Sequence, residues 1–382
     1  MRVALVHDWL DTWGGGEAVL AELLGMFPDA DVHTLIDVMP ARERARLNAG
    51  RVIESSLASL PAATRWFRYA AVVWPQVVER FDLSAYDLVI SDSHAVAKGV
   101  HRAPHARHLC YCHTPARFAW AMGDIYRERA ARGSSARRAV ARALLDRFRR
   151  WDLSAARGVD RFVANSKHIA AAIKSCYGRD ADVVYPPVDV ARFVPSRSVR
   201  GDYFVTVSRL VPYKRVDLLL EAFRRLPELS LVVIGEGPER AELMRRAPAN
   251  VEWRGFVDDA ELAATLAGAQ AFVYAAQEDF GIALVEAQAA GTPVIALANG
   301  GAPEIVRGLG APDPTGVLFE SQTTEAIVAA VRTFVQMGEQ MSRDACRANA
   351  LRFAPEHFRA GVARAIERMC TGTQPVASPV PS

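Results

Sequence analysis

The hydrophobic residues of this chain fall into short runs rich in valine and isoleucine, and stretches with helical spacing separate the runs. In the first half the runs cover residues 3–6, 32–36, 88–90, 108–112, 162–164 and 183–185. Short apolar runs of this kind are typical of buried strands, and their alternation with helices predicts a parallel, doubly wound α/β sheet. Such sheets bind their ligands at the carboxyl ends of the strands.

The same alternation starts again in the second half, with apolar runs at residues 204–207, 231–234, 251–254, 272–274, 294–296 and 317–319. The paired prolines Pro186 and Pro187 forbid a continuing helix or central strand, so residues 185–198 are typical of a linker. We therefore predict two Rossmann-like domains, residues 1–187 and 188–354. A last helix over about 355–370 has no strand after it, and we expect it to cap the sheet or to join the first domain. The Pro- and Ser-containing end, 371–382, is predicted to be a disordered tail.

Two carboxylates eight positions apart, Glu278 and Glu286, flank the start of a predicted helix. The apolar run before Glu278 predicts a strand, so Glu278 lies in a strand-to-helix turn. The unpaired N–H groups of Phe280, Gly281 and Ile282, together with the helix dipole, favour an anion in that turn. At about 1.5 Å per residue, the two carboxylates lie roughly 8–12 Å apart, which suits the two ends of a nucleotide sugar. Taken alone, the pair is more often a loop carboxylate and a surface helix residue.

The bulk composition excludes several classes of protein. The chain has 382 residues, of which 51% are hydrophobic, and its formal net charge of +3 does not favour nucleic-acid binding. No apolar run reaches the roughly 18 residues of a membrane span, and the start of the chain is interrupted too soon for a signal peptide. The five cysteines show no CxxC spacing, which fits free thiols in a reducing compartment. We expect a cytoplasmic protein.

Two strand ends in the first half carry candidate chemistry. Three glycines, 14–16, precede a helix and would let backbone N–H groups approach a phosphate, with a plain flexible turn as the alternative. The dinucleotide and P-loop glycine patterns are absent. His113 follows a strand, where its imidazole could bind a sugar hydroxyl or carry a proton. His108, Cys110 and Cys112 share one strand face, but no second cluster completes a tetrahedral zinc site.

Basic residues cluster in two further stretches, 65–74 and 127–151. The second holds nine arginines, and Val140, Leu144, Phe148 and Trp151 fall on one helical face. Basic surfaces flanked by aromatic residues suit anionic lipid headgroups. An ordinary core face with solvated arginines is the more common outcome for either stretch alone.

The strand ends of the second half form a polar set. Its members are Ser208, Arg209 and Lys214, residues 235–237, 255–256, 278–281 and 300–301. A guanidinium and an ammonium group at one strand end suit a diphosphate, because arginine offers a bidentate fork and lysine a point charge.

Taken in order, these segments resemble the family 4 retaining nucleotide-sugar glycosyltransferases, which have two facing Rossmann-like domains with a cleft between them (GT-B). The resemblance covers nearly the whole chain and rests on residues 14–17, 113–115, 164–166, 185–189, 207–214, 234–238 and 278–286. It looks closest to bacterial mannosyltransferases of O-antigen and exopolysaccharide synthesis; residues 112–117 and 208–214 suggest this branch.

The resemblance implies roles for the matching positions. The implied catalytic residues are His113, Arg209, Lys214 and Glu278, and the implied substrate-binding residues are Gly15, Gly16, Gly235, Phe256, Asp279, Phe280, Gly281, Ile282 and Glu286. In this scheme Arg209 and Lys214 bind the donor diphosphate and Glu286 binds the ribose. Two departures are Arg215 and Ser208, which stand where many members have glycine. Neither removes a binding group.

The implied activity is transfer of a hexose, mannose from GDP-mannose foremost or else a UDP-hexose, to a lipid-linked or growing polysaccharide acceptor. Such an acceptor favours peripheral contact with the inner face of the plasma membrane through residues 65–74 and 127–151. No obligatory metal is expected, because Arg209, Lys214 and a helix N-terminus could neutralise the leaving diphosphate. The D-x-D segments at 29–31 and 180–182 lie far from this set in sequence. A non-hydrolysing sugar-nucleotide epimerase and a non-catalytic sugar-nucleotide-binding protein are the alternatives.

Overall fold

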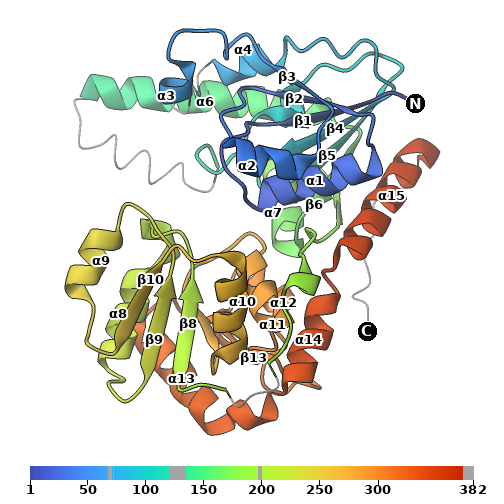
Figure 1. The fold of residues 1–382 in the computed structure, drawn as a ribbon. Coiled ribbons are helices and arrows are strands. Elements are labelled where there is room, and N and C mark those ends of the chain that lie inside the picture. Colours follow the sequence, from blue (N-terminus) through green and yellow to red (C-terminus); the bar gives the residue numbers. More distant parts are fainter. Residues whose placement is uncertain (68–70, 72, 121–134, 197–199, 373–382) are drawn as a thin grey trace. The chain divides into compact units, whose positions relative to one another are not determined.

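The computed structural model describes residues 1–67, 71, 73–120, 135–196 and 200–372. The chain divides into two compact units, one formed by Met1–Pro187 with Glu356–Ser382 and the other by Val188–Pro355. Each unit is built on one sheet whose strands are all parallel (Figure 1). The predicted tail lies largely in residues 373–382, outside the described part of the chain.

The first unit carries a seven-stranded sheet of order β3-β2-β1-β4-β5-β6-β7. Its strands are β1 (Val3–His7), β2 (Asp31–Thr34), β3 (Arg51–Glu54), β4 (Leu88–Ser93), β5 (Arg107–Cys112), β6 (Arg161–Ala164) and β7 (Ala181–Val183). Its helices are α1 (Gly15–Met26), α2 (Ala41–Arg44), α3 (Ala63–Trp66), α4 (Trp74–Val78), α6 (Ser135–Arg157), α7 (Lys167–Tyr177) and α15 (Pro355–Thr371). The strand order reverses between β1 and β4, and the ends of neighbouring parallel strands are brought together there.

The second unit carries a six-stranded sheet of order β10-β9-β8-β11-β12-β13. Its strands are β8 (Tyr203–Val207), β9 (Ser230–Ile234), β10 (Val251–Gly255), β11 (Phe272–Tyr274), β12 (Val294–Leu297) and β13 (Gly316–Phe319). Its helices are α8 (Val216–Arg224), α9 (Arg240–Arg246), α10 (Asp259–Gly268), α11 (Ile282–Ala289), α12 (Ala302–Ile305), α13 (Thr324–Met337) and α14 (Arg343–Leu351). Here the order reverses between β8 and β11.

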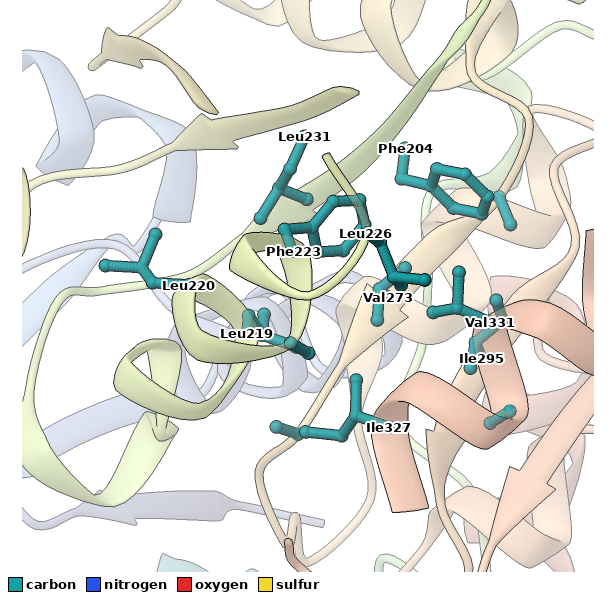
Figure 2. Close-up of a cluster of buried hydrophobic side chains, with 14 of the residues drawn as sticks. Phe204, Leu219, Leu220, Phe223, Leu226, Leu231, Val273, Ile295, Ile327 and Val331 are labelled. Atoms are coloured by element: carbon teal, nitrogen blue, oxygen red, sulfur yellow. The ribbon is translucent and has the colours of Figure 1, made fainter. Parts of the chain in front are cut away.

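Packing of α8 and α13 on one face of the second sheet forms a large core cluster (Figure 2). Phe204 of β8 packs against both helices, with its ring centroid 5.6 Å from that of Phe223 on α8 and 5.8 Å from that of Phe334 on α13. Both contacts are edge-on, the geometry that aromatic quadrupoles favour. These helices hold the sheet rigid behind its strand ends.

The last helix, α15, belongs to the core of the first unit. Phe358, Val362 and Met369 pack in one cluster with strand residues of the first sheet. A Cβ atom on Gly361 would lie 2.7 Å from a Val184 methyl group, so only glycine allows this close approach. The last helix, α15, therefore packs in the same core cluster as α1, the first helix of the chain.

The predicted fold class is confirmed, since both parallel sheets form from the apolar runs. The strand β3 was not predicted. Arg51 and Glu54 at its ends are exposed, and Val52 and Ile53 are only half-buried, so this edge strand lacks the continuous apolar run of a central one. The run predicted at 183–185 forms its strand two residues earlier, at β7.

The two basic stretches differ from the prediction in part. Phe67 and Trp74 are buried in a core cluster of the first unit, so these rings do not face solvent. In α6, Phe148 is buried in the same cluster, whereas Val140 and Leu144 are 59% and 38% exposed. Residues 68–70, 72 and 127–134 of these stretches lie outside the described part of the chain. The C-terminal half of α6 thus packs in the core through Phe148, whereas Val140 and Leu144 in its N-terminal half leave an exposed apolar face.

A single buried carboxylate ties the turn after β4 to the end of β1. Asp8 Oδ2 accepts hydrogen bonds from the backbone N–H groups of His94 and Ala95 (2.6 and 2.9 Å), and Oδ1 accepts from those of Val96 and Ala97 (2.6 and 2.7 Å). Burial alone would raise the pKa of Asp8, but the charge of His94 and these N–H groups outweigh it and lower the pKa. The carboxylate form is therefore part of the folded structure.

We predict that Asp8→Asn destabilises the first unit by on the order of 3 kcal/mol at pH 7, because an amide NH₂ cannot accept and leaves buried N–H donors unpaired. The folded pKa of Asp8 is lowered, so its stabilisation is present above the unfolded pKa, near 4, and is lost as pH falls toward the folded value. The difference in unfolding free energy between wild type and Asp8→Asn should therefore become smaller below about pH 4. Urea unfolding followed by tryptophan fluorescence measures it, since every tryptophan except Trp253 lies in this unit.

Asp29→Asn is the matched control, because Asp29 is exposed and its replacement should change stability by less than about 0.5 kcal/mol. An Asp8→Asn variant as stable as this control at pH 7 would contradict the anchoring role.

Candidate active site

Arg209 and Lys214, the two cationic residues predicted to bind the diphosphate, lie where the strand order of the second sheet reverses. Arg209 follows β8 and is exposed, and Lys214 ends the 3₁₀ turn Pro212–Lys214 just beyond it. Glu278 lies between β11, the strand next to β8, and α11. The described part of the chain contains no ion pair that uses the Arg209 guanidinium. This edge of the sheet therefore carries the exposed Arg209 guanidinium group, which has no ion-pair partner among the described residues, and the mostly buried ion pair of Lys214 with Glu278.

Lys214 and Tyr274 converge on one oxygen of Glu278. Lys214 Nζ forms an ion pair with Glu278 Oε1 and donates to the Tyr274 hydroxyl at 3.0 Å, and that hydroxyl donates to Glu278 Oε1 at 2.6 Å. Burial and the Glu278 charge raise the pKa of Tyr274 well above its ordinary range, so the hydroxyl remains a donor. Lys214, expected on the diphosphate, is thus paired with Glu278 in this structure, and Glu278 keeps its second oxygen for another donor.

Glycines bring the backbone of neighbouring loops into direct contact at this edge. A Cβ atom on Gly235 would lie 1.9 Å from the Ser208 carbonyl oxygen, and one on Gly300 would lie 2.0 Å from the Glu278 carbonyl oxygen. Both glycines have positive φ angles, 137° and 70°, which L side chains rarely adopt. The Gly301 N–H donates to the Glu278 carbonyl oxygen at 2.8 Å and fixes the turn before α11. No larger residue fits at these positions.

The remaining predicted positions in this unit are placed around the start of α11. Gly281 is the N-cap with φ of 109°, Ile282 begins the helix, and Asp279 is half-buried. The Phe280 ring is buried and lies edge-on to Phe353 at 5.4 Å, so only its backbone can face a ligand. The first N–H groups of a helix have no intrahelical acceptor, and they favour an anion at this point.

Two further predicted binding residues lie on other segments of the second unit, Glu286 on α11 and Phe256 directly after β10. Glu286 is half-buried on α11; burial raises its pKa, and the charge of Arg192 opposes the rise. Phe256 follows β10 with 85% of its surface exposed, an unusual position for a phenyl ring. A flat apolar ring and a carboxylate are groups that suit a base and a ribose.

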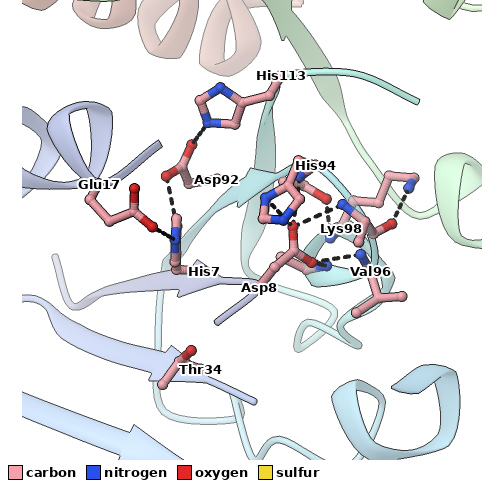
Figure 3. A network of polar contacts seen from close by, with 12 residues as sticks. His7, Asp8, Glu17, Thr34, Asp92, His94, Val96, Lys98 and His113 are labelled. Atoms are coloured by element: carbon pink, nitrogen blue, oxygen red, sulfur yellow. Dashed lines mark hydrogen bonds and ion pairs between the residues drawn. The ribbon is translucent and has the colours of Figure 1, made fainter. Parts of the chain in front are cut away.

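The first unit brings two histidines and two carboxylates together at its own strand reversal (Figure 3). Asp92 of β4 lies between them, with Oδ2 2.8 Å from His7 Nδ1 and Oδ1 2.5 Å from His113 Nε2. His7 Nε2 is 3.5 Å from Glu17 Oε1 in the first turn of α1. A Cβ atom on Gly16 would lie 3.4 Å from the His7 ring and 3.7 Å from His113 Nε2. Gly15 thus begins α1, and Gly16 lies directly against the two imidazoles.

The charged groups of this cluster stabilise one another's ionised forms. Burial by itself lowers the pKa of His7, but hydrogen bonds and charge from Asp92 and Glu17 raise it to about 10, so His7 is an imidazolium at neutral pH. Burial pushes the pKa of Asp92 upward, and the two histidines outweigh it and hold that pKa well below its usual range. For His94 nearby, burial dominates and lowers the pKa.

Sequence reasoning gave no role to His7, Asp92 or Tyr274. Each occupies one of the last two positions of a buried strand, and a polar residue there is the signal that could have found them. Asp31 and Asp182 of the two D-x-D segments are committed elsewhere, Asp31 to the Tyr86 hydroxyl and Asp182 to Arg161. Within the described residues, no three histidine, cysteine or acidic side chains are grouped so that they could hold a metal ion.

Comparison with known families and proteins gives matches across the chain. The family model for glycosyltransferase family 4 matches residues 13–192, and the model for glycosyl transferases group 1 matches residues 189–352. A GDP-mannose-dependent alpha-(1-6)-phosphatidylinositol monomannoside mannosyltransferase of Mycolicibacterium smegmatis is 31% identical over 223 residues, which is 50% of this chain and 56% of that protein. A D-inositol 3-phosphate glycosyltransferase of Mycolicibacterium gilvum is 34% identical over 39% of each chain. The matches thus span about half the length of these curated relatives or less.

Solved structures share the fold at low identity. Anabaena HepE in complex with UDP and glucose superposes with a TM-score of 0.67 at 18% identity, covering 96% of this chain and 100% of that one. Sucrose-phosphate synthase from Thermosynechococcus elongatus gives a TM-score of 0.70 at 16% identity, covering 98% and 100%. Because the two family matches meet at residues 189–192 and together run from residue 13 to residue 352, the chain belongs to the family 4 glycosyltransferases and has the GT-B fold.

Proposed function

We propose that this chain transfers a hexose, foremost mannose from GDP-mannose, to a lipid-linked or growing polysaccharide acceptor in bacterial surface glycan synthesis. The observation that carries the proposal is the grouping of Arg209, Lys214 and Glu278 at the strand reversal of the second sheet. The GDP-mannose-dependent phosphatidylinositol monomannoside mannosyltransferase relative supports the donor and a lipid acceptor. The retaining outcome follows from the family.

The chemistry rests on fixed positive charge. Breaking the sugar–phosphate bond builds negative charge on the leaving diphosphate and positive charge on the anomeric carbon. Arg209, Lys214 and the N–H groups at the start of α11 supply preorganised positive potential for the diphosphate. Glu278 offers its second oxygen to a hydroxyl of the transferred sugar, and His113 of the first unit is assigned to the same sugar. Nucleoside diphosphates of either guanine or uracil fit this charge pattern, and the relatives favour guanine.

Peripheral membrane contact forms part of the proposal. On the described part of α6, exposed Val140 and Leu144 are flanked by exposed Arg142, Arg147 and Arg150. An apolar stripe bordered by arginines binds anionic headgroups through burial and charge together. No helix in the described ranges is long and apolar enough to span a bilayer. Contact with the inner leaflet would place the protein where a lipid-linked acceptor is exposed.

For the donor, we expect GDP-mannose to raise the melting temperature more than UDP-glucose, ADP-glucose or dTDP-glucose, since a ligand that binds only the folded state stabilises it by mass action. Glu286→Ala should weaken GDP-mannose binding roughly tenfold, because the ribose hydroxyls lose their acceptor. Glu339→Ala, which removes an exposed carboxylate of the same unit, should keep the full shift. An unchanged shift in Glu286→Ala contradicts the ribose assignment, and no shift with any of the four donors overturns the donor proposal.

For catalysis, Arg209→Ala should lower kcat on the order of 10²–10³-fold, the scale for losing one preorganised donor at a developing anion. Arg209 is exposed, so the variant should unfold at the wild-type temperature. The assay is GDP release from GDP-mannose with a bacterial lipid extract as the acceptor source. Arg332→Ala, an exposed arginine on α13, is the control and should retain full turnover. Turnover within threefold of wild type in Arg209→Ala would count against this role. Conversion of the donor sugar without extract would instead indicate an epimerase.

For the membrane, flotation with phosphatidylglycerol vesicles should recover more protein than flotation with phosphatidylcholine vesicles, and added salt should weaken the binding. Val140→Asp combined with Leu144→Asp should abolish the binding. The control is Val335→Asp, because Val335 is 55% exposed on α13 of the second unit. Equal recovery with both vesicle types, or full recovery of the double variant, would remove membrane contact from the proposal.

A further inference from the structure

The Asp92 carboxylate bridges two imidazoles that come from different strands of the first sheet. His7 ends β1, Asp92 lies opposite it on the neighbouring β4, and His113 follows β5, which pairs with the other side of β4. The His113 N–H donates to the Ser93 carbonyl oxygen at 2.9 Å and extends that pairing by one residue. The sheet register therefore sets the distance of Asp92 from both rings.

Hydrogen-bond chemistry determines which nitrogen of His113 carries the proton. A carboxylate can only accept, so the 2.5 Å contact with Asp92 Oδ1 requires a proton on His113 Nε2. In the neutral ring the other nitrogen, Nδ1, then carries a lone pair. Within the described residues Nδ1 has no hydrogen-bond partner, and the His113 side chain is 15% exposed. A neutral His113 therefore presents an acceptor, not a donor, to a ligand.

His7 keeps Asp92 in place from the other side. Its ring is 1% exposed and lies between two carboxylates, with Nδ1 on Asp92 and Nε2 facing Glu17. As an imidazolium it donates to Asp92 and offsets its charge. The other groups that face the cluster are the Tyr111 ring, 5.2 Å from the His113 ring, and the His94 ring, 6.3 Å from the His7 ring. No second carboxylate among the described residues bonds His113, so its proton position depends on Asp92.

We propose that Asp92 is a positioning residue that holds His113 in its Nε2–H tautomer, so that Nδ1 accepts a hydrogen bond from a substrate hydroxyl group. A phosphate oxygen at neutral pH offers no proton to Nδ1, so His113 recognises the sugar or the acceptor hydroxyl and not the diphosphate. The statement deepens the proposed function and rests on it for the identity of the substrate.

Asp92→Ala removes this arrangement in a defined way. A methyl group accepts no hydrogen bond, so nothing replaces the Asp92 oxygen that holds the proton on His113 Nε2. Neutral His113 is then free to carry its proton on either ring nitrogen, and Nδ1 is no longer held as an acceptor.

The test is ¹⁵N NMR of the full chain with labelled histidines, in which His113→Gln identifies the His113 signals among nine histidines. Wild type should show protonated Nε2 and unprotonated Nδ1 at His113, and Asp92→Ala should lose this single tautomer. With GDP-mannose and lipid extract, Asp92→Ala should lower kcat at least on the order of 10²-fold while the KM for the donor changes little. Asp182→Asn is the control, because it removes another buried carboxylate of the same unit, and it should leave both the tautomer and kcat unchanged.

The same single tautomer in wild type and Asp92→Ala, or an Asp92→Ala turnover within threefold of wild type, overturns the proposal. If Asp92→Ala does not fold, the wild-type spectrum decides alone, since a protonated Nδ1 at His113 contradicts the assignment. A wild type with the expected tautomer that transfers no sugar from any donor supports the role of Asp92 and overturns the proposed function instead.

Discussion

A lysine ammonium group and a tyrosine hydroxyl share one oxygen of Glu278 at the strand reversal of the second sheet, and the proposed chemistry depends on this ion pair. The pair keeps an ammonium group and a carboxylate partly desolvated beside the start of α11. A bound diphosphate would compete with Glu278 for Lys214, and the carboxylate would then gain a further oxygen for sugar hydroxyls. In the proposed mechanism, donor binding is therefore coupled to the release of a Glu278 oxygen that can accept from a sugar hydroxyl. Arg209, exposed just after β8, forms no ion pair with the described residues and adds positive charge at this edge.

The two units place opposite chemistry at equivalent points of similar sheets. At the β8–β11 reversal the second unit presents cations and helix N–H groups, which suit a leaving anion. At the β1–β4 reversal the first unit presents imidazoles set by carboxylates, which suit hydroxyl groups. The rigid scaffold is common to both, since buried parallel strands backed by helices leave only their carboxyl ends for polar chemistry. HepE and sucrose-phosphate synthase share this scaffold at 18% and 16% identity, so the fold tolerates wide change elsewhere.

The fold could be predicted because central parallel strands are apolar on both faces and leave a continuous signal. The edge strand β3, with Arg51 and Glu54 at its ends, carries no such signal. The common location of Arg209, Lys214 and Glu278 at one sheet edge also followed from the sequence, because each comes after a recognisable strand. The ion pair between Lys214 and Glu278 could not be predicted from the sequence, because it depends on which strands are neighbours in the sheet. The hydrogen bond between His7 and Asp92 joins residues 85 positions apart in the sequence, and it could not be predicted for the same reason. The aromatic residues Phe67 and Trp74 misled the surface prediction, because composition does not tell a buried ring from an exposed one.

The central claim is that Arg209, Lys214 and the start of α11 bind the diphosphate of the donor. A crystal structure of the protein with GDP tests it most directly. The account predicts β-phosphate oxygens within ~3 Å of the Arg209 guanidinium group and of Lys214 Nζ, facing the first N–H groups of α11. GDP bound at another edge of the sheet, with Lys214 still held by Glu278 and Arg209 in solvent, would contradict it.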